Sequence, residues 1–197
     1  MPPFRTALLL CLLAAPAGAN DLTARVWGGA SALLGTDLSF GDGPGTAEDF
    51  DTGFAAGGAV GFDYADSPFR SEIEFAYRTG DAEGDGGDFA STSVMANLYY
   101  EFEGPSALTP YVGGGLGYVT EIDFDVASGP NAGEYSDRGG AAFQLMAGAS
   151  YAFTPRVAID GELRYFDAGS RTLGGPGGDL DADYATVEAI VALRISF

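Results

Sequence analysis

The last eleven residues, 187–197, read VEAIVALRISF and alternate between apolar and polar positions. The apolar positions are Val187, Ala189, Val191, Leu193, Ile195 and Phe197. A period of two places these residues on one face of a β-strand, and it places Glu188, Arg194 and Ser196 on the opposite face. The segment therefore predicts a strand with one continuous apolar face, and the fold depends on what that face contacts.

The same alternation recurs along the chain, for example in FAAGGAVGFDY (54–64), FRSEIEFAYR (69–78) and TSVMANLYYEF (92–102). Further alternating segments lie at 22–31, 111–119, 141–153, 156–166 and 184–197. The pattern predicts eight strands of about ten residues, the length that crosses a bilayer at a tilt. After residue 20 the sequence contains no apolar run of the ~18 residues that a spanning helix requires.

The connections between these segments alternate between short and long. The short ones are ADSP (65–68), GPSAL (104–108) and TP (154–155), and the long ones are 35–51, 80–89, 120–138 and 167–183. An up-and-down barrel of the outer membrane has short periplasmic turns and long outer loops. The sequence therefore predicts an all-β fold for residues 20–197, an eight-stranded antiparallel up-and-down transmembrane β-barrel.

Aromatic residues flank the short turns, as expected of a girdle at a membrane interface. They are Phe62, Tyr64, Phe69, Tyr100, Phe102, Tyr111, Tyr151, Phe153 and Phe197. A soluble lipocalin-like barrel, with its apolar face inward, is the competing interpretation. The apolar positions are rich in Ala, Gly, Val and Leu, and many of the 31 glycines lie within strands, where they would weaken a soluble sheet. The apolar face of VEAIVALRISF is thus predicted to face lipid.

The N-terminus has the features of a secretory signal peptide, residues 1–19. Arg5 precedes a short apolar stretch, and Ala17-Gly18-Ala19 forms a small-residue cleavage site near Ala19. We therefore expect localisation in the cell outer membrane after cleavage, with both barrel termini in the periplasm. Cys11 lies inside the signal, so residues 20–197 contain no cysteine.

The charge and composition exclude several classes of function. Without Arg5 the chain has eight Arg against 28 Asp and Glu, a net charge of −20. Nucleic-acid binders need basic patches, so no nucleic-acid partner is expected. The chain has no histidine to act as a general base, so we expect neither an enzyme nor a cofactor.

The sequence resembles the small eight-stranded outer-membrane proteins of Gram-negative bacteria, namely the opacity-like, OmpX-like and OmpA-barrel-like porin family proteins. LTPYVGGGLGYV (108–119), VAIDGELRYF (157–166) and the terminal aromatic residue carry the resemblance. It implies that the barrel-assembly machinery recognises the last strand through Val191, Leu193, Ile195 and Phe197. The partners expected of a monomer are then outer-membrane lipid, this machinery during insertion and an unidentified extracellular molecule.

The polar faces of the strands define what the barrel contains. We expect the lumen to hold an ion-pair network of Arg25, Arg70, Glu72, Glu74, Asp160, Glu162, Arg164, Glu188 and Arg194. Arg78, Asn97, Glu101 and Gln144 fall on the same inward face. An eight-stranded barrel is just wide enough for its own side chains, so Arg–carboxylate pairs would plug it, with Arg194 reaching Asp160 or Glu162. The alternative is a narrow channel for ions or small solutes.

The four long connections contain 18 acidic residues against Arg138 and Arg171. In DAEGDGGD (81–88), Asp81, Glu83 and Asp85 match the first ligand spacings of an EF-hand, but the twelfth position is Thr92 and no helices flank it. Solvated acidic loops are therefore favoured over weak divalent-ion binding. The predicted function is structural or surface-interactive, in envelope integrity or adhesion, with acidic loops outside the cell.

Overall fold

A computed structural model describes residues 19–34, 36–40, 46–48, 52–64, 66–81, 87–102, 104–127 and 132–197; for residues 19–20, 36–40, 46–48 and 81 it describes the backbone alone. The described strands are β1 (Ala19–Leu33), β2 (Thr36–Phe40), β3 (Thr46–Glu48), β4 (Gly53–Tyr64), β5 (Phe69–Asp81), β6 (Gly87–Glu101), β7 (Leu108–Val126), β8 (Gly133–Asp137), β9 (Gly140–Thr154), β10 (Val157–Gly175) and β11 (Gly178–Ser196). The predicted signal peptide lies almost wholly outside the described residues, since β1 begins at Ala19.

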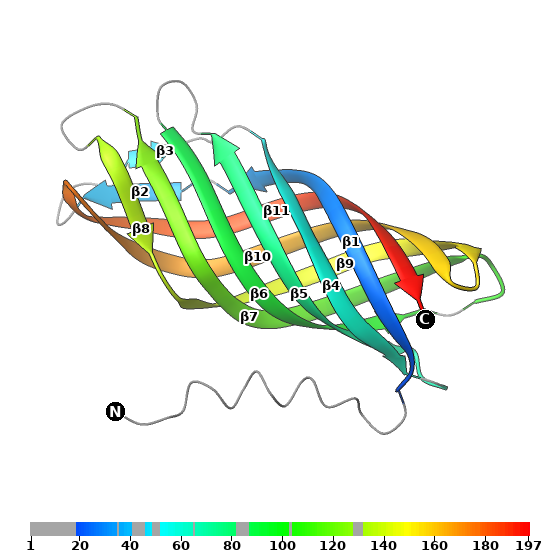
Figure 1. Ribbon diagram of the computed structural model, residues 1–197. Coiled ribbons are helices and arrows are strands. Elements are labelled where there is room, and N and C mark those ends of the chain that lie inside the picture. Colours follow the sequence, from blue (N-terminus) through cyan, green and yellow to red (C-terminus); the bar gives the residue numbers. More distant parts are fainter. Residues whose placement is uncertain are drawn as a thin grey trace, which may run out of the picture.

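Eight of these strands form a closed antiparallel ring in the order β1, β4, β5, β6, β7, β9, β10, β11. β11 then pairs with β1 and closes the ring, with Val26 opposite Leu193 and Ser31 opposite Glu188. Figure 1 shows the tilted strands wrapping around a common axis. The predicted eight-stranded up-and-down barrel is confirmed.

The two ends of the barrel differ. The connections β4–β5, β6–β7 and β9–β10 are short, and the pairing of Thr23 with Ser196 places the start of β1 and the end of β11 at this same end. We call it the short-turn end and the opposite end the long-loop end. No helix among the described residues is long and apolar enough to cross a membrane.

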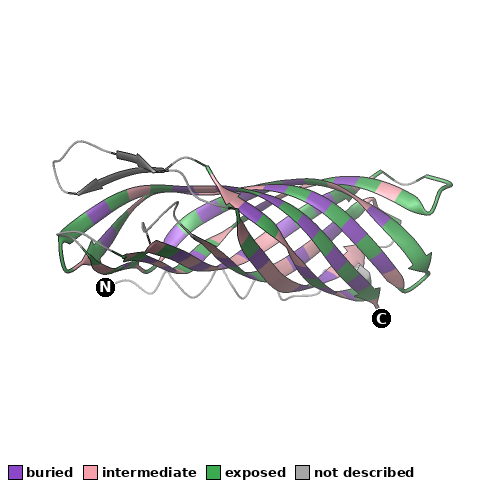
Figure 2. Cartoon of the chain, turned by 90° about the horizontal axis from the view of Figure 1, so that it is seen from above, coloured by how far each residue is buried: buried purple, intermediate pink, exposed green. Residues whose placement is uncertain are grey.

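Inward and outward residues alternate along every long strand, visible as alternating buried and exposed bands in Figure 2. On the outer surface, Leu163 and Val191 are 63% and 64% exposed. Their neighbours Glu162 and Ala192 point inward and are buried. We call the part of the barrel that carries these apolar outward residues the membrane half. It is apolar outside and polar inside, as a barrel in lipid requires.

Several strands are longer than the sequence predicted. β7, β10 and β11 have 19 residues each, and β10 and β11 stay paired up to Gly175 and Gly178. The prediction of long connections over 120–138 and 167–183 was therefore wrong, because these residues are largely strand. Beyond the membrane half the outward positions become acidic or hydroxylated, so the apolar outer pattern stops although the strands continue.

A second prediction, that Tyr111 belongs to the outer aromatic girdle, was also wrong. Tyr111 is 2% exposed and points into the barrel, whereas Leu108 and Val112 on the same strand face outward. The glycines after it make room inside: a Cβ at Gly113 would lie 2.6 Å from the Tyr99 ring. Most of the other girdle residues are outer-surface residues, between 40% and 66% exposed: Phe69, Tyr100, Phe102, Tyr151, Phe153 and Phe197.

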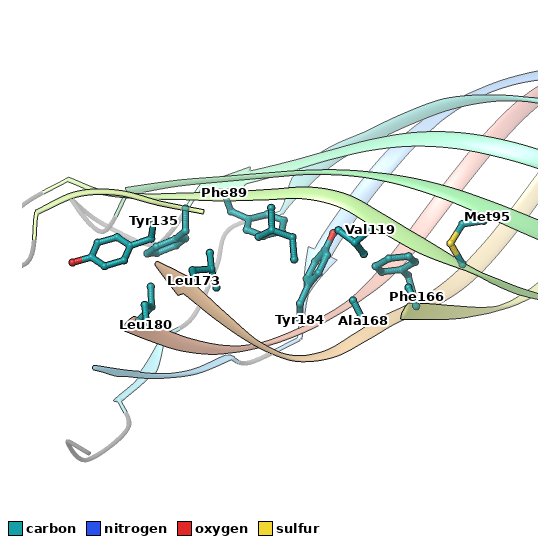
Figure 3. Packing of buried hydrophobic residues seen from close by; sticks show 12 residues of the cluster. Phe89, Met95, Val119, Tyr135, Phe166, Ala168, Leu173, Leu180 and Tyr184 are labelled. Atoms are coloured by element: carbon teal, nitrogen blue, oxygen red, sulfur yellow. The ribbon is translucent and has the colours of Figure 1, made fainter. Parts of the chain in front are cut away.

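An apolar cluster fills the interior of the long-loop end. Its buried members are Phe89, Met95, Val119, Ile122, Phe124, Tyr135, Ala142, Phe166, Ala168, Leu173, Leu180 and Tyr184. Figure 3 shows side chains from opposite walls meeting in the interior. Here the strands are apolar inside and polar outside, the reverse of the membrane half.

Candidate functional site in the barrel lumen

At the short-turn end of the lumen, two arginines and two carboxylates from four different strands form a closed ring of ion pairs. The Arg70 Nε atom lies 2.9 Å from Glu101 Oε1 and 3.9 Å from Asp63 Oδ1. Arg194 Nη1 lies 3.3 Å and 3.7 Å from the same two oxygens. The Asp63 and Glu101 side chains are 33% and 19% exposed, so this ring is the part of the network nearest to solvent.

Deeper in the lumen, Arg25 on β1 contacts three carboxylates. Its guanidinium lies 2.9 Å from Glu162 Oε2, 3.3 Å from Asp160 Oδ2 and 3.8 Å from Glu72 Oε2. The Tyr111 hydroxyl donates a hydrogen bond of 3.0 Å to Glu162. These groups are buried, so each charge is offset by a charged partner on another strand of the lumen wall rather than by bulk water.

Arg164 on β10 occupies the centre of the network. It donates two hydrogen bonds to Glu74 across the bore, of 2.9 Å and 2.8 Å, and two to Glu162, of 2.8 Å and 3.2 Å. Its guanidinium also lies 3.7 Å from Glu188 and 4.6 Å from the centre of the Trp27 ring. The two parallel bonds to one carboxylate are the geometry for which arginine is suited.

Arg78 on β5 forms the top of the network. It pairs with Glu188, donates a hydrogen bond of 2.8 Å to Ser93 and lies 4.0 Å from the centre of the Phe166 ring. Phe166 belongs to the apolar cluster. Arg78 is therefore the junction between the ionic and the apolar fillings of the barrel.

The structure brings the predicted network residues together in one lumen. Arg70 also pairs with Glu72, and Arg194 lies 3.7 Å from Asp160 and donates a hydrogen bond of 2.9 Å to Ser150. The five fully buried carboxylates balance the five arginines: Glu72, Glu74, Asp160, Glu162 and Glu188 against Arg25, Arg70, Arg78, Arg164 and Arg194.

Sequence reasoning missed Asp63, Trp27 and Tyr99 as members of the site. Their signal was present, because each falls on the inward parity of its own strand. The contacts across the bore were not predictable from alternation, since strand tilt decides which inward residues meet.

The outer surface at the long-loop end is acidic. Asp88, Asp125 and Glu134 lie directly opposite one another on β6, β7 and β8, and such like-charged pairs are destabilising. Arg138 offsets part of this charge through a 2.8 Å ion pair with Glu121. Partial burial, and then the charges of Glu121 and Glu134, raise the pKa of Asp123 above its ordinary value.

The calcium-loop candidates cannot be placed. Glu83 and Asp85 lie outside the described residues, and for Asp81 the backbone alone is described. Within the described part of the chain, no group of three or more His, Cys, Asp or Glu is arranged to hold a metal ion.

The family model of the outer membrane protein beta-barrel domain matches residues 6–194. The chain belongs to this family. Its members are barrels of the cell outer membrane, which agrees with the apolar outer surface of the membrane half.

The chain is similar to the outer membrane protein PagN of Salmonella typhimurium, with 28% identity over 139 residues. The alignment covers 59% of this chain and 58% of that protein, so the chain spans less than two thirds of the relative's length. Among solved structures, Neisserial surface protein A matches with a TM-score of 0.65 and 18% identity, covering 91% of this chain and 99% of that one. OprG of Pseudomonas aeruginosa matches with a TM-score of 0.65 and 18% identity, covering 91% and 97%. At these identities the two structures support the fold alone.

Proposed function

We propose that the protein is a closed outer-membrane barrel with a structural or surface-interaction role, rather than a pore or an enzyme. The observation that carries this proposal is the double filling of the lumen. In the membrane half, Arg164 bridges the bore to Glu74, and in the long-loop half the apolar cluster closes the interior. A lumen filled in two ways leaves the outer surface to contact lipid and partners.

The outward-facing part of that surface is the acidic long-loop end, which we propose lies outside the cell. The short-turn end, where β1 begins and β11 ends, would then lie in the periplasm. The antiparallel pairing of β10 with β11 continues up to Gly175 and Gly178, which makes this outer extension a stiff support for a partner at its surface. Envelope integrity or adhesion by a monomer fits this arrangement.

Conductance in planar bilayers tests the closed barrel. The refolded wild-type protein should give no steady current, because an ion would have to displace buried ion pairs and then apolar side chains. Arg164→Met should raise conductance if the network is the barrier in the membrane half. Large, stable, ion-selective currents from the wild type would contradict the proposal.

A narrow channel for ions or small solutes is the second candidate. It is favoured by buried polar atoms that have no hydrogen-bond partner within the described residues, among them the two carboxylate oxygens of Asp160 and Nε of Arg25 and Arg194. Water threaded along the network would satisfy these atoms. A continuous line of such water molecules would conduct small currents in planar bilayers. Asp160→Asn should change the ion selectivity of these currents.

We further propose that the last strand is the segment that the assembly machinery recognises. Val191 and Phe197 are 64% and 66% exposed, and the backbone of Phe197 is held by a 2.9 Å hydrogen bond to Leu22. Deleting Phe197 should reduce insertion in cells more than folding in detergent. An equal loss in both settings would mean that Phe197 contributes ordinary packing.

A further inference from the structure

A small recess lies at the top of the ion-pair network, where β1, β5, β6 and β11 meet. Arg78, Ser31 and Thr186 supply its polar lining, and Leu33 and Phe89 supply apolar walls. The recess is partly open, and about 240 Å³ of empty space lies in and in front of it, open solvent included. It therefore borders both the ionic network and the apolar cluster.

Arg78 is compensated less than the other arginines of the lumen. Within the described residues, Arg25, Arg70, Arg164 and Arg194 each contact three carboxylates. Arg78 contacts Glu188 alone. Glu188 is itself shared, because its second oxygen faces Arg164 at 3.7 Å. The Arg78 charge is therefore offset only by one shared carboxylate, less than that of any other arginine in the lumen.

One edge of the Arg78 guanidinium is also unpaired. Its Nε donates to Glu188 and its Nη1 donates to Ser93, while Nη2 is buried and has no hydrogen-bond partner within the described residues. Leaving such a charged donor unsatisfied in a buried site destabilises the fold, because the group has lost its water and gained no partner. Because Arg78 lines the recess, an acceptor bound there within reach of Nη2 would remove this cost.

We propose that the recess binds one small monovalent anion of the size of chloride, as the second anionic partner of Arg78. The Arg78 edge supplies the charge, the Ser31 hydroxyl can donate a further hydrogen bond, and Leu33 and Phe89 form apolar walls. The acidic surface of the long-loop end opposes entry of an anion, but charges farther than about 8 Å are largely screened at physiological salt.

Bromide identifies the occupant directly. Crystals of the refolded barrel, residues 20–197, grown in sodium bromide should show an anomalous peak at hydrogen-bond distance from Arg78 Nη2. Water in the recess with no anomalous signal would overturn the proposal.

Thermal unfolding in detergent gives an independent test in solution. When chloride replaces gluconate at constant ionic strength, the wild type should gain stability until the site saturates, as expected for a ligand bound by the folded state. The double variant Arg78→Gln with Glu188→Gln removes one charge of each sign and should lose the gain. The matched pair Arg70→Gln with Glu101→Gln, at the other end of the network, should keep it.

Ser31→Leu fills the recess while leaving the Arg78–Glu188 pair in place, so it tests the site even if the double variant fails to fold. It should also abolish the chloride effect. An unchanged chloride effect in Ser31→Leu, or the same effect in both double variants, would show that chloride acts elsewhere.

Discussion

The membrane half and the long-loop half of this barrel are built from the same strands with opposite polarity. On β11, Val191 faces outward and Glu188 inward in the membrane half, whereas Asp181 faces outward and Leu180 inward beyond it. The alternation continues through both halves, but the environment outside the barrel changes from lipid to water. A period of two therefore assigns residues to two faces, and the surrounding solvent decides which face is apolar.

The ionic interior should be the more sensitive of the two to loss of one side chain. Arg164→Met leaves Glu74 without its bidentate partner in a buried site, and breaking such a pair costs about 3–5 kcal/mol. Urea unfolding in lipid vesicles measures this loss. Arg156→Met, at an exposed turn, is the matched control and should change little. A cost for Arg164→Met as small as the control's would mean that water enters the lumen and compensates for the lost arginine.

The apolar interior should behave like the core of a soluble domain. Leu173 is 1% exposed within the apolar cluster, so Leu173→Ala should cost about 2–4 kcal/mol through lost burial and the cavity left behind. Leu163→Ala on the same strand is the matched control, because Leu163 faces lipid, which fills the space. Equal losses for the two variants would contradict a separate packed interior beyond the membrane half.

The ring at the short-turn end should tolerate change better than the centre of the network. Arg194→Ala should cost about 1–2 kcal/mol, less than a fully buried pair, because Asp160 keeps Arg25 and the other two partners of Arg194, Asp63 and Glu101, are partly exposed. The same urea titration measures it. A loss as large as that of Arg164→Met would mean that the ring, and not the centre, holds the barrel closed.

The acidic outer surface gives the smallest effect and depends on pH. Because the pKa of Asp123 is raised in the folded state, its charged form destabilises the fold above that pKa, and the penalty vanishes below the ordinary range of aspartate. Asp123→Asn should therefore raise the free energy of unfolding by roughly a few tenths of a kcal/mol near pH 8, and it should leave this free energy unchanged near pH 3. Urea unfolding of the wild type and the variant at the two pH values measures this difference. A variant less stable than the wild type at pH 8 would contradict the inference that the Asp123 charge destabilises the fold.

Most of the membrane half could be predicted from the sequence, because lipid on the outside makes alternation easy to interpret. The outward direction of Val191 and the inward direction of Glu188 both follow from that pattern. The extension of β10 and β11 could not be predicted in the same way, since Asp179, Asp181 and Asp183 resemble a loop when lipid is assumed outside. Local sequence also carries no information on which side chains meet across the bore, such as Arg78 on Phe166.

Cysteine labelling along β11 tests the reversal of polarity most directly, because residues 20–197 contain no cysteine. Four single variants sample both faces in both halves: Leu180→Cys, Asp181→Cys, Ile190→Cys and Val191→Cys. In vesicles with a membrane-impermeant maleimide on both sides, Asp181→Cys should react rapidly and the other three should stay protected, by the apolar cluster, by the lumen and by lipid. Rapid labelling of Val191→Cys, or protection of Asp181→Cys, would contradict the account.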